Sequence, residues 1–517
     1  MGKYLKSFCF YIVLAIFCIS LGGCSSGEKN NKEEDIPLET VDLDPVIISF
    51  CFIGYGPDSR PRNLGSINEM LEELNKKTSE ALHTTVKFQW LPYENYDVEL
   101  IKLLQSAGGP DAFFTYNPEE QHKAGVIKDI TDLLPQTAPQ YFSLLSETWR
   151  EDIRYAEVDH KLYGILNNGI YPPQYFIIAR QDLVEKYASE GIYSLEDYGR
   201  FMQAVKDKEK DMVPGYASAN DFFEAYMLGN GYFRGSGTGL YCRWNSEKLT
   251  QIPIETTEEF KSAYKLYRQW REGNLLLDPE SREYGTLVQN GQLVSMIIYG
   301  MNIHSPQYFN SSYKYETYPL YKDSMYTSTL LTYSIGINAN SSNAERVLMF
   351  IEWLHSSQEN YDLFHYGIKD KHYKLLDNAL DISQSGNNAI ADWWGSMAFR
   401  NYRYDRPYPF EPVNYKEFLN NCLINTFSYR EAYEKFGYDI DKYEDLSEEE
   451  KKLYAEEYEK TRELSQKRSN IYFEFITQTN AGNFTKTLSE MMEEQGGKSS
   501  TDRLLEYYKT GMEKYKK

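Results

Sequence analysis

Short apolar runs rich in β-branched and aromatic residues alternate with amphipathic segments along most of this chain. Residues 45–56 (PVIISFCFIGYG) end in glycine and predict a buried strand. Residues 66–83 place apolar side chains at helical spacing, and Ser66 with Glu69 predicts a capping box at the start of that helix. Strand, helix and strand signals then follow at 84–93, 96–109 and 110–116. This order predicts an α/β fold with a mostly parallel sheet that is covered by helices on both faces.

The alternation continues along the rest of the chain. Further strand and helix signals occupy residues 161–168, 175–191, 194–206, 256–273, 291–300 and 334–367. A charged segment near 430–470 has a helical pattern. No repeat with a period of 20 to 50 residues is present, which argues against a helical-repeat, glycan-binding lipoprotein. The length of 517 residues indicates two or more domains.

The N-terminus changes character at Cys24. Lys3 and Lys6 precede an apolar run at 7–21, which is shorter than the ~20 residues needed to span a bilayer. Residues 21–24 (LGGC) resemble a bacterial lipobox, in which signal removal leaves a lipid-modified cysteine as the new N-terminus. The alternative is an ordinary signal peptide with an incidental cysteine.

We therefore expect three N-terminal features. Residues 1–23 would be a lipoprotein signal peptide, and Cys24 would carry a lipid anchor that includes palmitate. Residues 24–43 contain too few apolar side chains to fold and would be a flexible tether. The expected location is the extracellular face of the cell membrane, with the protein held there by the lipid anchor.

The composition of the chain restricts the classes of molecule that it can bind. The formal net charge of −21 argues against nucleic acid and anionic lipid surfaces. The 46 Tyr, 26 Phe and 7 Trp make 15% of the chain aromatic, and such rings combine a flat apolar face with a polar edge. This excess supports a binding role weakly. After the anchor, the cysteines at 51, 242 and 422 have no metal-like spacing, and we expect buried thiols.

Catalytic, nucleotide and metal motifs are absent from the sequence. No phosphate-binding loop, dinucleotide fingerprint or H-E-x-x-H pattern occurs, and no histidine pair has metal-like helical spacing. Residues 439–450 resemble a calcium loop superficially, but Glu444 stands where the turn requires Gly; a capping box of Ser447 and Glu450 fits better. We expect no metal and no cofactor. A glycosidase needs a pair of catalytic carboxylates, and no stretch of the sequence indicates which of the 76 acidic residues would form one.

Four segments carry a resemblance to a known family. Residues 108–134, 179–206, 290–302 and 318–378 are similar, in this order, to motifs of family 1 extracellular solute-binding proteins, the lipid-anchored receptors of ABC-type sugar transporters. Residues 365–375 (HYGIKDKHYKL) and 392–399 (DWWGSMAF) further resemble the larger Gram-positive branch with an extended C-terminal tail. The charged stretch near 430–470 departs from this branch and looks like an insertion.

The resemblance implies a periplasmic-binding-protein-like fold with two α/β lobes. Each lobe would have a central, mostly parallel sheet flanked by helices, and a multi-strand hinge would join them, with crossings near 166–171, 317–322 and 379–392. The expected N-terminal lobe comprises residues 44–166 and 320–380. The expected C-terminal lobe comprises residues 167–319 and 381–517, with the insertion near 430–470.

Candidate ligand contacts follow from the loops after the predicted strands, because sites in such sheets lie at the carboxyl ends of strands. The first-lobe candidates are Tyr116 and Asn117. The candidates at the first crossing are Asn168, Tyr171 and Tyr175. The second-lobe candidates are Tyr299, Asn302, Trp393 and Trp394, with Tyr216 and Trp244 as weaker ones. In the resembling family, aromatic residues after the last crossing form a stacking wall for sugar rings.

The resemblance thus implies a monomeric, non-catalytic receptor. It would capture a carbohydrate, an oligosaccharide in particular, between two lobes and deliver it to the permease of an ABC transporter. A secreted, membrane-anchored glycoside hydrolase and a binding protein for a peptide are the alternatives. The identity, linkage and length of the ligand are not encoded in any motif.

Overall fold

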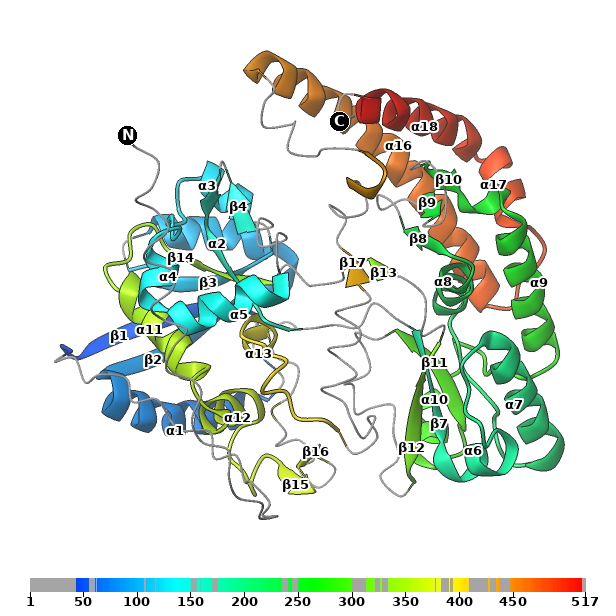
Figure 1. The fold of residues 1–517 in the computed structure, drawn as a ribbon, viewed down its shortest axis with the longest axis horizontal. Helices are drawn as coiled ribbons and strands as arrows, with labels where there is room; N and C mark the ends of the chain where they lie inside the picture. The colour runs from blue at the N-terminus through cyan, green and yellow to red at the C-terminus, as the bar shows by residue number, and fades with distance from the viewer. Residues whose placement is uncertain are drawn as a thin grey trace, which may run out of the picture. The chain divides into compact units, whose positions relative to one another are not determined.

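A five-stranded and a three-stranded sheet, each with its own helices and apolar core, organise the chain (Figure 1). The computed structural model describes residues 43–54, 61, 63–106, 108–116, 118–149, 156–158, 160–169, 175–234, 240–243, 250–299, 313–320, 326–327, 333–376, 378–382, 390, 394–408, 426–427, 434–437 and 447–513. In this part of the chain, no helix is long and apolar enough to cross a membrane. The expected signal peptide, anchor and tether lie outside the described residues.

The larger sheet, here the first sheet, has the strand order β2-β1-β3-β14-β6. Its strands are β1 (Val46–Gly54), β2 (Thr84–Pro92), β3 (Ala112–Thr115), β6 (Gly164–Leu166) and β14 (Ser334–Ile337). β1 pairs in parallel with β2 and β3, whereas β14 runs antiparallel to both β3 and β6. The sheet is therefore mixed, with β14 as the reversed strand. β14 comes after the strands of the second sheet in the sequence, so the chain returns to the first sheet through this strand.

Helices cover the first sheet and form the first core, which includes Phe50, Phe113, Leu74 and Ile351. The helices of this part are α1 (Leu64–Leu82), α2 (Tyr96–Gln105), α3 (Pro118–Lys123), α4 (Leu133–Thr137), α5 (Pro139–Trp149), α11 (Ala344–Leu354) and α12 (Gln358–Tyr366). The capping box predicted at Ser66 is wrong. α1 begins at Leu64 after Asn63, and Ser66 is a buried residue within the helix.

The second sheet has the order β11-β7-β12, with β7 (Tyr175–Arg180), β11 (Ser295–Tyr299) and β12 (Tyr315–Pro319). Both pairs are antiparallel, so the expectation of a mostly parallel sheet does not hold here. Alternate residues of β7 point to opposite faces of the sheet. Ile177 belongs to the second core, whereas Phe176 and Ile178 belong to a third cluster.

The helices next to the second sheet are α6 (Gln181–Tyr187), α7 (Leu195–Lys208), α8 (Ala219–Gly229), α9 (Glu258–Glu272) and α10 (Tyr284–Gln289). Their apolar faces build the second core, in which Phe222 lies 5.2 Å from Trp270 between ring centroids. A small sheet adjoins α8 and consists of β8 (Tyr232–Arg234), β9 (Leu240–Arg243) and β10 (Ile252–Pro253). The shortest elements are β4 (Glu157–Val158), β5 (Lys161–Leu162), β13 (Tyr326–Thr327), β15 (Lys374–Leu376), β16 (Ala379–Asp381), β17 (Thr426–Phe427), η1 (Tyr93–Asn95) and η3 (Ile254–Thr256).

Three helices end the described chain: α16 (Glu448–Asn480), α17 (Leu488–Glu494) and α18 (Gly497–Glu513) (Figure 1). α16 and α17 contribute to the second core, and α18 packs on these two helices. The predicted capping box of Ser447 and Glu450 is confirmed at the start of α16. On α16, Phe475 lies 5.9 Å from Phe223 of α8, between ring centroids. The charged segment near 430–470 thus includes the first half of α16. The second half of α16 is apolar on one side.

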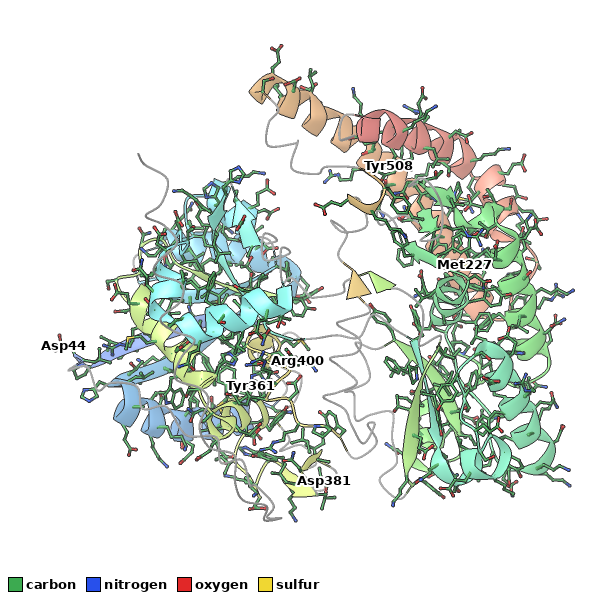
Figure 2. All side chains as sticks on the ribbon, viewed as in Figure 1. Asp44, Met227, Tyr361, Asp381, Arg400 and Tyr508 are labelled. Carbon is green, nitrogen blue, oxygen red and sulfur yellow. The ribbon has the colours of Figure 1, made fainter. Side chains whose placement is uncertain are left out.

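Residues 394–405 differ from the expected domain assignment. The sequence predicts that they belong to the C-terminal lobe with the rest of 381–517, but Phe399 packs against Phe50 of β1 at 5.7 Å between ring centroids. α13 (Trp394–Ala398) contacts β1 and β3. Beyond it, Asp405 accepts hydrogen bonds from Tyr361 of α12 at 2.5 Å and from Arg400 at 2.6 Å. Tyr361 and Arg400 both lie in the part of the molecule that holds the first sheet (Figure 2). The chain therefore stays with the first core beyond the expected crossing at 379–392.

Candidate functional site

The chain passes between the two sheets at one end of each sheet. In the first sheet, Ser334 at the start of β14 pairs with Thr115 at the end of β3 and with Leu166 at the end of β6. In the second sheet, Tyr175 begins β7, Tyr299 ends β11, and the two residues pair with each other. We call the end of the first sheet at Thr115, Leu166 and Ser334 the first edge. We call the end of the second sheet at Tyr175 and Tyr299 the second edge. Ligand sites in open α/β sheets lie beyond strand ends of this kind.

Tyrosines and acids gather at the first edge. Tyr116 follows β3 and is 36% exposed, and its ring meets Phe114 edge-on at 5.5 Å between centroids. Burial raises the pKa of the Tyr116 hydroxyl, and the nearby Asp97 and Tyr93 raise it further. Burial also raises the pKa of Asp97, with the charge of Glu120 as a second cause. An exposed phenol with acids around it can stack on a sugar face and accept hydrogen bonds from sugar hydroxyls.

The second edge has a similar composition. The rings of Tyr175 and Tyr299 lie 5.2 Å apart between centroids. Burial raises the pKa of the Tyr175 hydroxyl strongly, and the charges of Glu224 and Asp221 on α8 add to this shift. The structure therefore brings together Tyr175 and Tyr299, both predicted from the sequence, with two carboxylates that were not predicted.

Tyr216 does not join this group. Its backbone N–H donates to Ser295 O at 3.0 Å, and its ring lies 4.8 Å from that of Tyr284, between centroids. It packs against the third cluster, on the sheet face that carries Phe176, whereas Tyr175 and Tyr299 pack with the second core. We therefore place Tyr216 outside the second edge.

Asn168 has a structural role and is not exposed to a ligand. It is fully buried, its Nδ2 donates to Asn401 Oδ1 at 2.9 Å, and its Oδ1 accepts from Thr148 Oγ1. Its backbone also bonds to Arg400 O and to Tyr402 N, at 2.7 and 2.9 Å. This corrects the expectation of a ligand contact, because the amide already binds protein partners on both sides. Asn168 instead fixes residues 400–402 to the first core.

Several candidates lie outside the described residues: Asn117, Tyr171, Trp244, Asn302 and Trp393. Trp394 begins α13, but its side chain is outside the described part as well. Because α13 contacts β1 and β3, this helix belongs with the first sheet and not with the second, as was expected for both tryptophans. Cys24, the expected anchor, lies in the part of the chain that is not described.

Sequence reasoning missed Tyr93 and Asp97 at the first edge and Asp221 and Glu224 at the second. Tyr93 follows β2 directly, so the rule that selected Tyr116 could have found it. Asp221 and Glu224 lie on a helix, and nothing in the sequence distinguishes them from the other acids.

The described residues contain no group of three His, Cys, Asp or Glu side chains that could hold a metal ion. Cys51 and Cys242 are buried free thiols, as expected, and burial raises the pKa of each to about 12. A thiol of this kind is inert as a nucleophile near neutral pH.

Residues 62–361 match the family model of bacterial extracellular solute-binding proteins, which is more than half of the chain. The chain belongs to this family, and the resemblance seen in the sequence is confirmed. The family consists of binding proteins. No curated protein matches the chain.

Solved structures share the fold at low sequence identity. The N-glycan transport solute-binding protein of Streptococcus pneumoniae is 16% identical, with a TM-score of 0.63 over 91% of this chain and 98% of that one. An extracellular solute-binding protein from Bifidobacterium longum subsp. infantis is 11% identical, with a TM-score of 0.56 over 90% and 99%. A solute-binding protein of the same subspecies, described as binding HMO and associated with an ABC transporter, is 12% identical, with a TM-score of 0.53 over 90% and 99%. These likenesses confirm the α/β, periplasmic-binding-protein-like fold.

Proposed function

We propose that this protein is a receptor that captures an oligosaccharide and delivers it to the permease of an ABC transporter. The observation that carries the proposal is the placement of Tyr116 at one edge and of Tyr175 and Tyr299 at the other. Both edges adjoin the segments through which the chain passes between the two sheets, which is where a two-lobed receptor would close on its ligand. The family membership, and the structural likeness to proteins that transport N-glycans and bind HMO, support a carbohydrate.

The mechanism requires binding and no bond-making step. Tyrosine rings would stack on the apolar faces of sugar rings, and carboxylates would accept hydrogen bonds from sugar hydroxyls. Asn117, Tyr171, Asn302, Trp244, Trp393 and Trp394 remain proposed contacts in the same site. A monomer is sufficient for this function.

A thermal-shift screen against glycans and peptides tests the proposal. A ligand that binds only the folded state raises its stability by about 2.7 kcal/mol at a concentration 100-fold above Kd. We expect oligosaccharides to raise the melting temperature and to be recovered intact after long incubation. Stabilisation by peptides alone would contradict the carbohydrate assignment, and sustained cleavage of the glycan would favour the anchored hydrolase.

Tyr116→Ala tests the first edge. We expect the oligosaccharide found in the screen to bind about 1–3 kcal/mol more weakly, because an aromatic anchor is lost, with a small change in melting temperature. The control is Phe473→Ala, which removes an exposed aromatic side chain on α16, outside both edges. Equal affinities of the two variants would remove Tyr116 from the site. Trp393→Ala and Trp394→Ala belong in the same series, with affinity and ligand-free stability measured separately.

We further propose that Cys24 anchors the protein at the extracellular face of the membrane. Cys24→Ser should either leave the signal uncleaved or release the protein into the medium, because the thiol that accepts the lipid is gone. Membrane and soluble fractions are compared by immunoblot. Cys18→Ser, within the apolar run, is the matched control and should stay anchored. A Cys24→Ser protein that is processed and still membrane-bound would contradict the anchor.

A further inference from the structure

Three segments of the chain lie side by side where β6 ends, and each leads between the two sheets. Residues 167–169 follow β6 and precede β7. Tyr333 directly precedes β14, by which the chain returns from the second sheet to the first. Residues 400–402 follow α13 and precede α16, which contributes to the second core. We call residues 167–169, Tyr333 and residues 400–402 together the junction.

Asn167 joins the first two of these segments. Its backbone N–H and its Nδ2 both donate to the carbonyl oxygen of Tyr333, at 3.2 and 3.0 Å. Its Oδ1 accepts from the Gly169 backbone N–H at 2.8 Å, so the same side chain also holds the backbone of its own segment. Asn167 is fully buried. These contacts continue the antiparallel pairing of β14 with β6 by one residue beyond the two strands.

Asn168 joins the first segment to the third. Its backbone N–H donates to Arg400 O at 2.7 Å, its carbonyl oxygen accepts from the Tyr402 N–H at 2.9 Å, and its Nδ2 donates to Asn401 Oδ1 at 2.9 Å. Asn168 and Asn401 are both fully buried and form a parallel β-bridge. Successive residues of an extended segment turn their bonding groups to opposite sides, so Asn167 bonds to one neighbour and Asn168 to the other.

Helices of the first core hold the junction from outside. Thr148 of α5 donates from Oγ1 to Asn168 Oδ1. The Asn401 backbone N–H donates to the hydroxyl oxygen of Tyr361 on α12 at 3.1 Å. Asn401 Nδ2 lies 3.4 Å from Nδ1 of His355, the residue that ends α11. The three segments are therefore bonded both to one another and to the first core.

The junction also lies close to the second sheet along the chain. Residues 170–174 alone separate Gly169 from Tyr175, which begins β7 at the second edge. Because a chain spans at most about 3.5 Å per residue, a fixed Gly169 restricts the start of β7 to within about 20 Å. Ordering a backbone costs conformational entropy, and a segment that is already ordered in the free protein spares a ligand this cost.

We propose that Asn167, Asn168 and Asn401 are positioning residues for ligand capture, which hold the three inter-sheet segments in the arrangement of the bound protein before any ligand binds. The inference rests on the proposed receptor function and goes beyond it, because it assigns affinity to residues that are fully buried and touch no ligand. Where the junction opens in part of the molecules, the apparent Kd rises in inverse proportion to the fraction in which it is formed.

The test compares Asn168→Ala, Asn401→Ala and the double variant. The probe is the oligosaccharide that gives the largest thermal shift with the native protein, and its Kd is measured by calorimetry well below the melting temperature of each variant. Each single substitution should raise the Kd about ten-fold, because it leaves a buried amide group without its partner. The double variant should raise the Kd by about the same factor, because either substitution alone breaks the same amide pair.

Asn360→Ala is the matched control. Asn360 is another buried amide of the first part of the chain, and its Nδ2 donates to Trp353 O at 2.9 Å, but it lies on α12 outside the junction. Its substitution should lower the melting temperature and keep the native Kd. Thr148→Val is a milder variant in case Asn168→Ala does not fold. It removes one hydrogen bond to Asn168 and keeps the side-chain shape, and it should raise the Kd about three-fold.

A measurement without ligand separates the junction from the receptor function. Small-angle scattering should give a larger radius of gyration for Asn168→Ala than for the native protein and for Asn360→Ala, because the start of β7 is less restricted. A native Kd in both single variants, or effects that multiply in the double variant, would overturn the positioning role while the receptor function stands. If no oligosaccharide binds the native protein, the receptor function is overturned, and an unchanged radius would then overturn the junction as well.

Discussion

Arg468→Ala will lower the free energy of unfolding of the second core by about 3–5 kcal/mol, the usual cost of leaving one partner of a buried ion pair alone. Arg468 on α16 is fully buried. Its Nη1 and Nη2 donate to Glu255 Oε1 and Oε2 at 2.8 and 2.5 Å, and Nη1 also donates to Thr501 Oγ1 at 2.7 Å. One guanidinium therefore joins η3, α16 and α18, and its removal leaves the Glu255 carboxylate buried without this partner.

Urea unfolding followed by circular dichroism measures this loss. The matched control is Arg268→Ala on α9, whose exposed pair with Glu272 should contribute less than about 1 kcal/mol. A double variant, Arg468→Met with Glu255→Leu, should recover much of the stability, because it removes the unpaired charge and keeps the volume. A loss below about 1 kcal/mol in Arg468→Ala would show that the C-terminal helices fold independently of the second core.

Hydrophobic periodicity was sufficient to predict the elements but not their pairing. β1, α2 and the capped helix after Ser194 form where the sequence pattern predicted them. The pattern carries no information on strand direction, so the antiparallel pairing of β7 with β11 and β12 could not be read from it. The same limit explains residues 394–405, because Phe399 is equally apolar whichever core it enters.

The candidate-site residues that can be predicted from the sequence are those that directly follow a strand. Tyr116 and Tyr299 were found by that rule, and both lie at the edges described above. Asn168 satisfied the same rule but is buried, since its amide bonds to Thr148 and Asn401. Asp221 and Glu224 come from α8, and only the folded chain brings their charges near enough to raise the pKa of the Tyr175 hydroxyl, in addition to burial.

Acidification from pH 7 to pH 5 will destabilise the first core through two buried histidines. His355 is 5% exposed and stacks on Tyr141 at 4.4 Å between centroids. Burial lowers the pKa of His355 to about 3, whereas an unfolded chain binds this proton near its ordinary value of about 6.5. Burial also lowers the pKa of His365, and the charges of His355 and Arg400 act in the same direction.

The sign follows from proton linkage. Between about pH 6.5 and 3, His355 binds a proton in the unfolded state but not in the folded state. The stability that neutral His355 contributes is therefore fully present above pH 6.5 and falls as the pH is lowered. At pH 5, His355 alone accounts for a loss of about 2 kcal/mol, which is 1.36 kcal/mol for each pH unit below 6.5. His365 adds to this loss.

Urea unfolding at pH 7 and at pH 5 separates this effect from the general protonation of carboxylates. The variant is His355→Phe, which keeps a ring against Tyr141 and cannot bind a proton. It should reduce the stability difference between the two pH values by about 2 kcal/mol, whatever its stability at pH 7. His83→Asn, at an exposed position with φ 49°, is the control and should keep the native difference. An unchanged difference in His355→Phe would mean that the His355 ring reaches solvent and accepts a proton in the folded state.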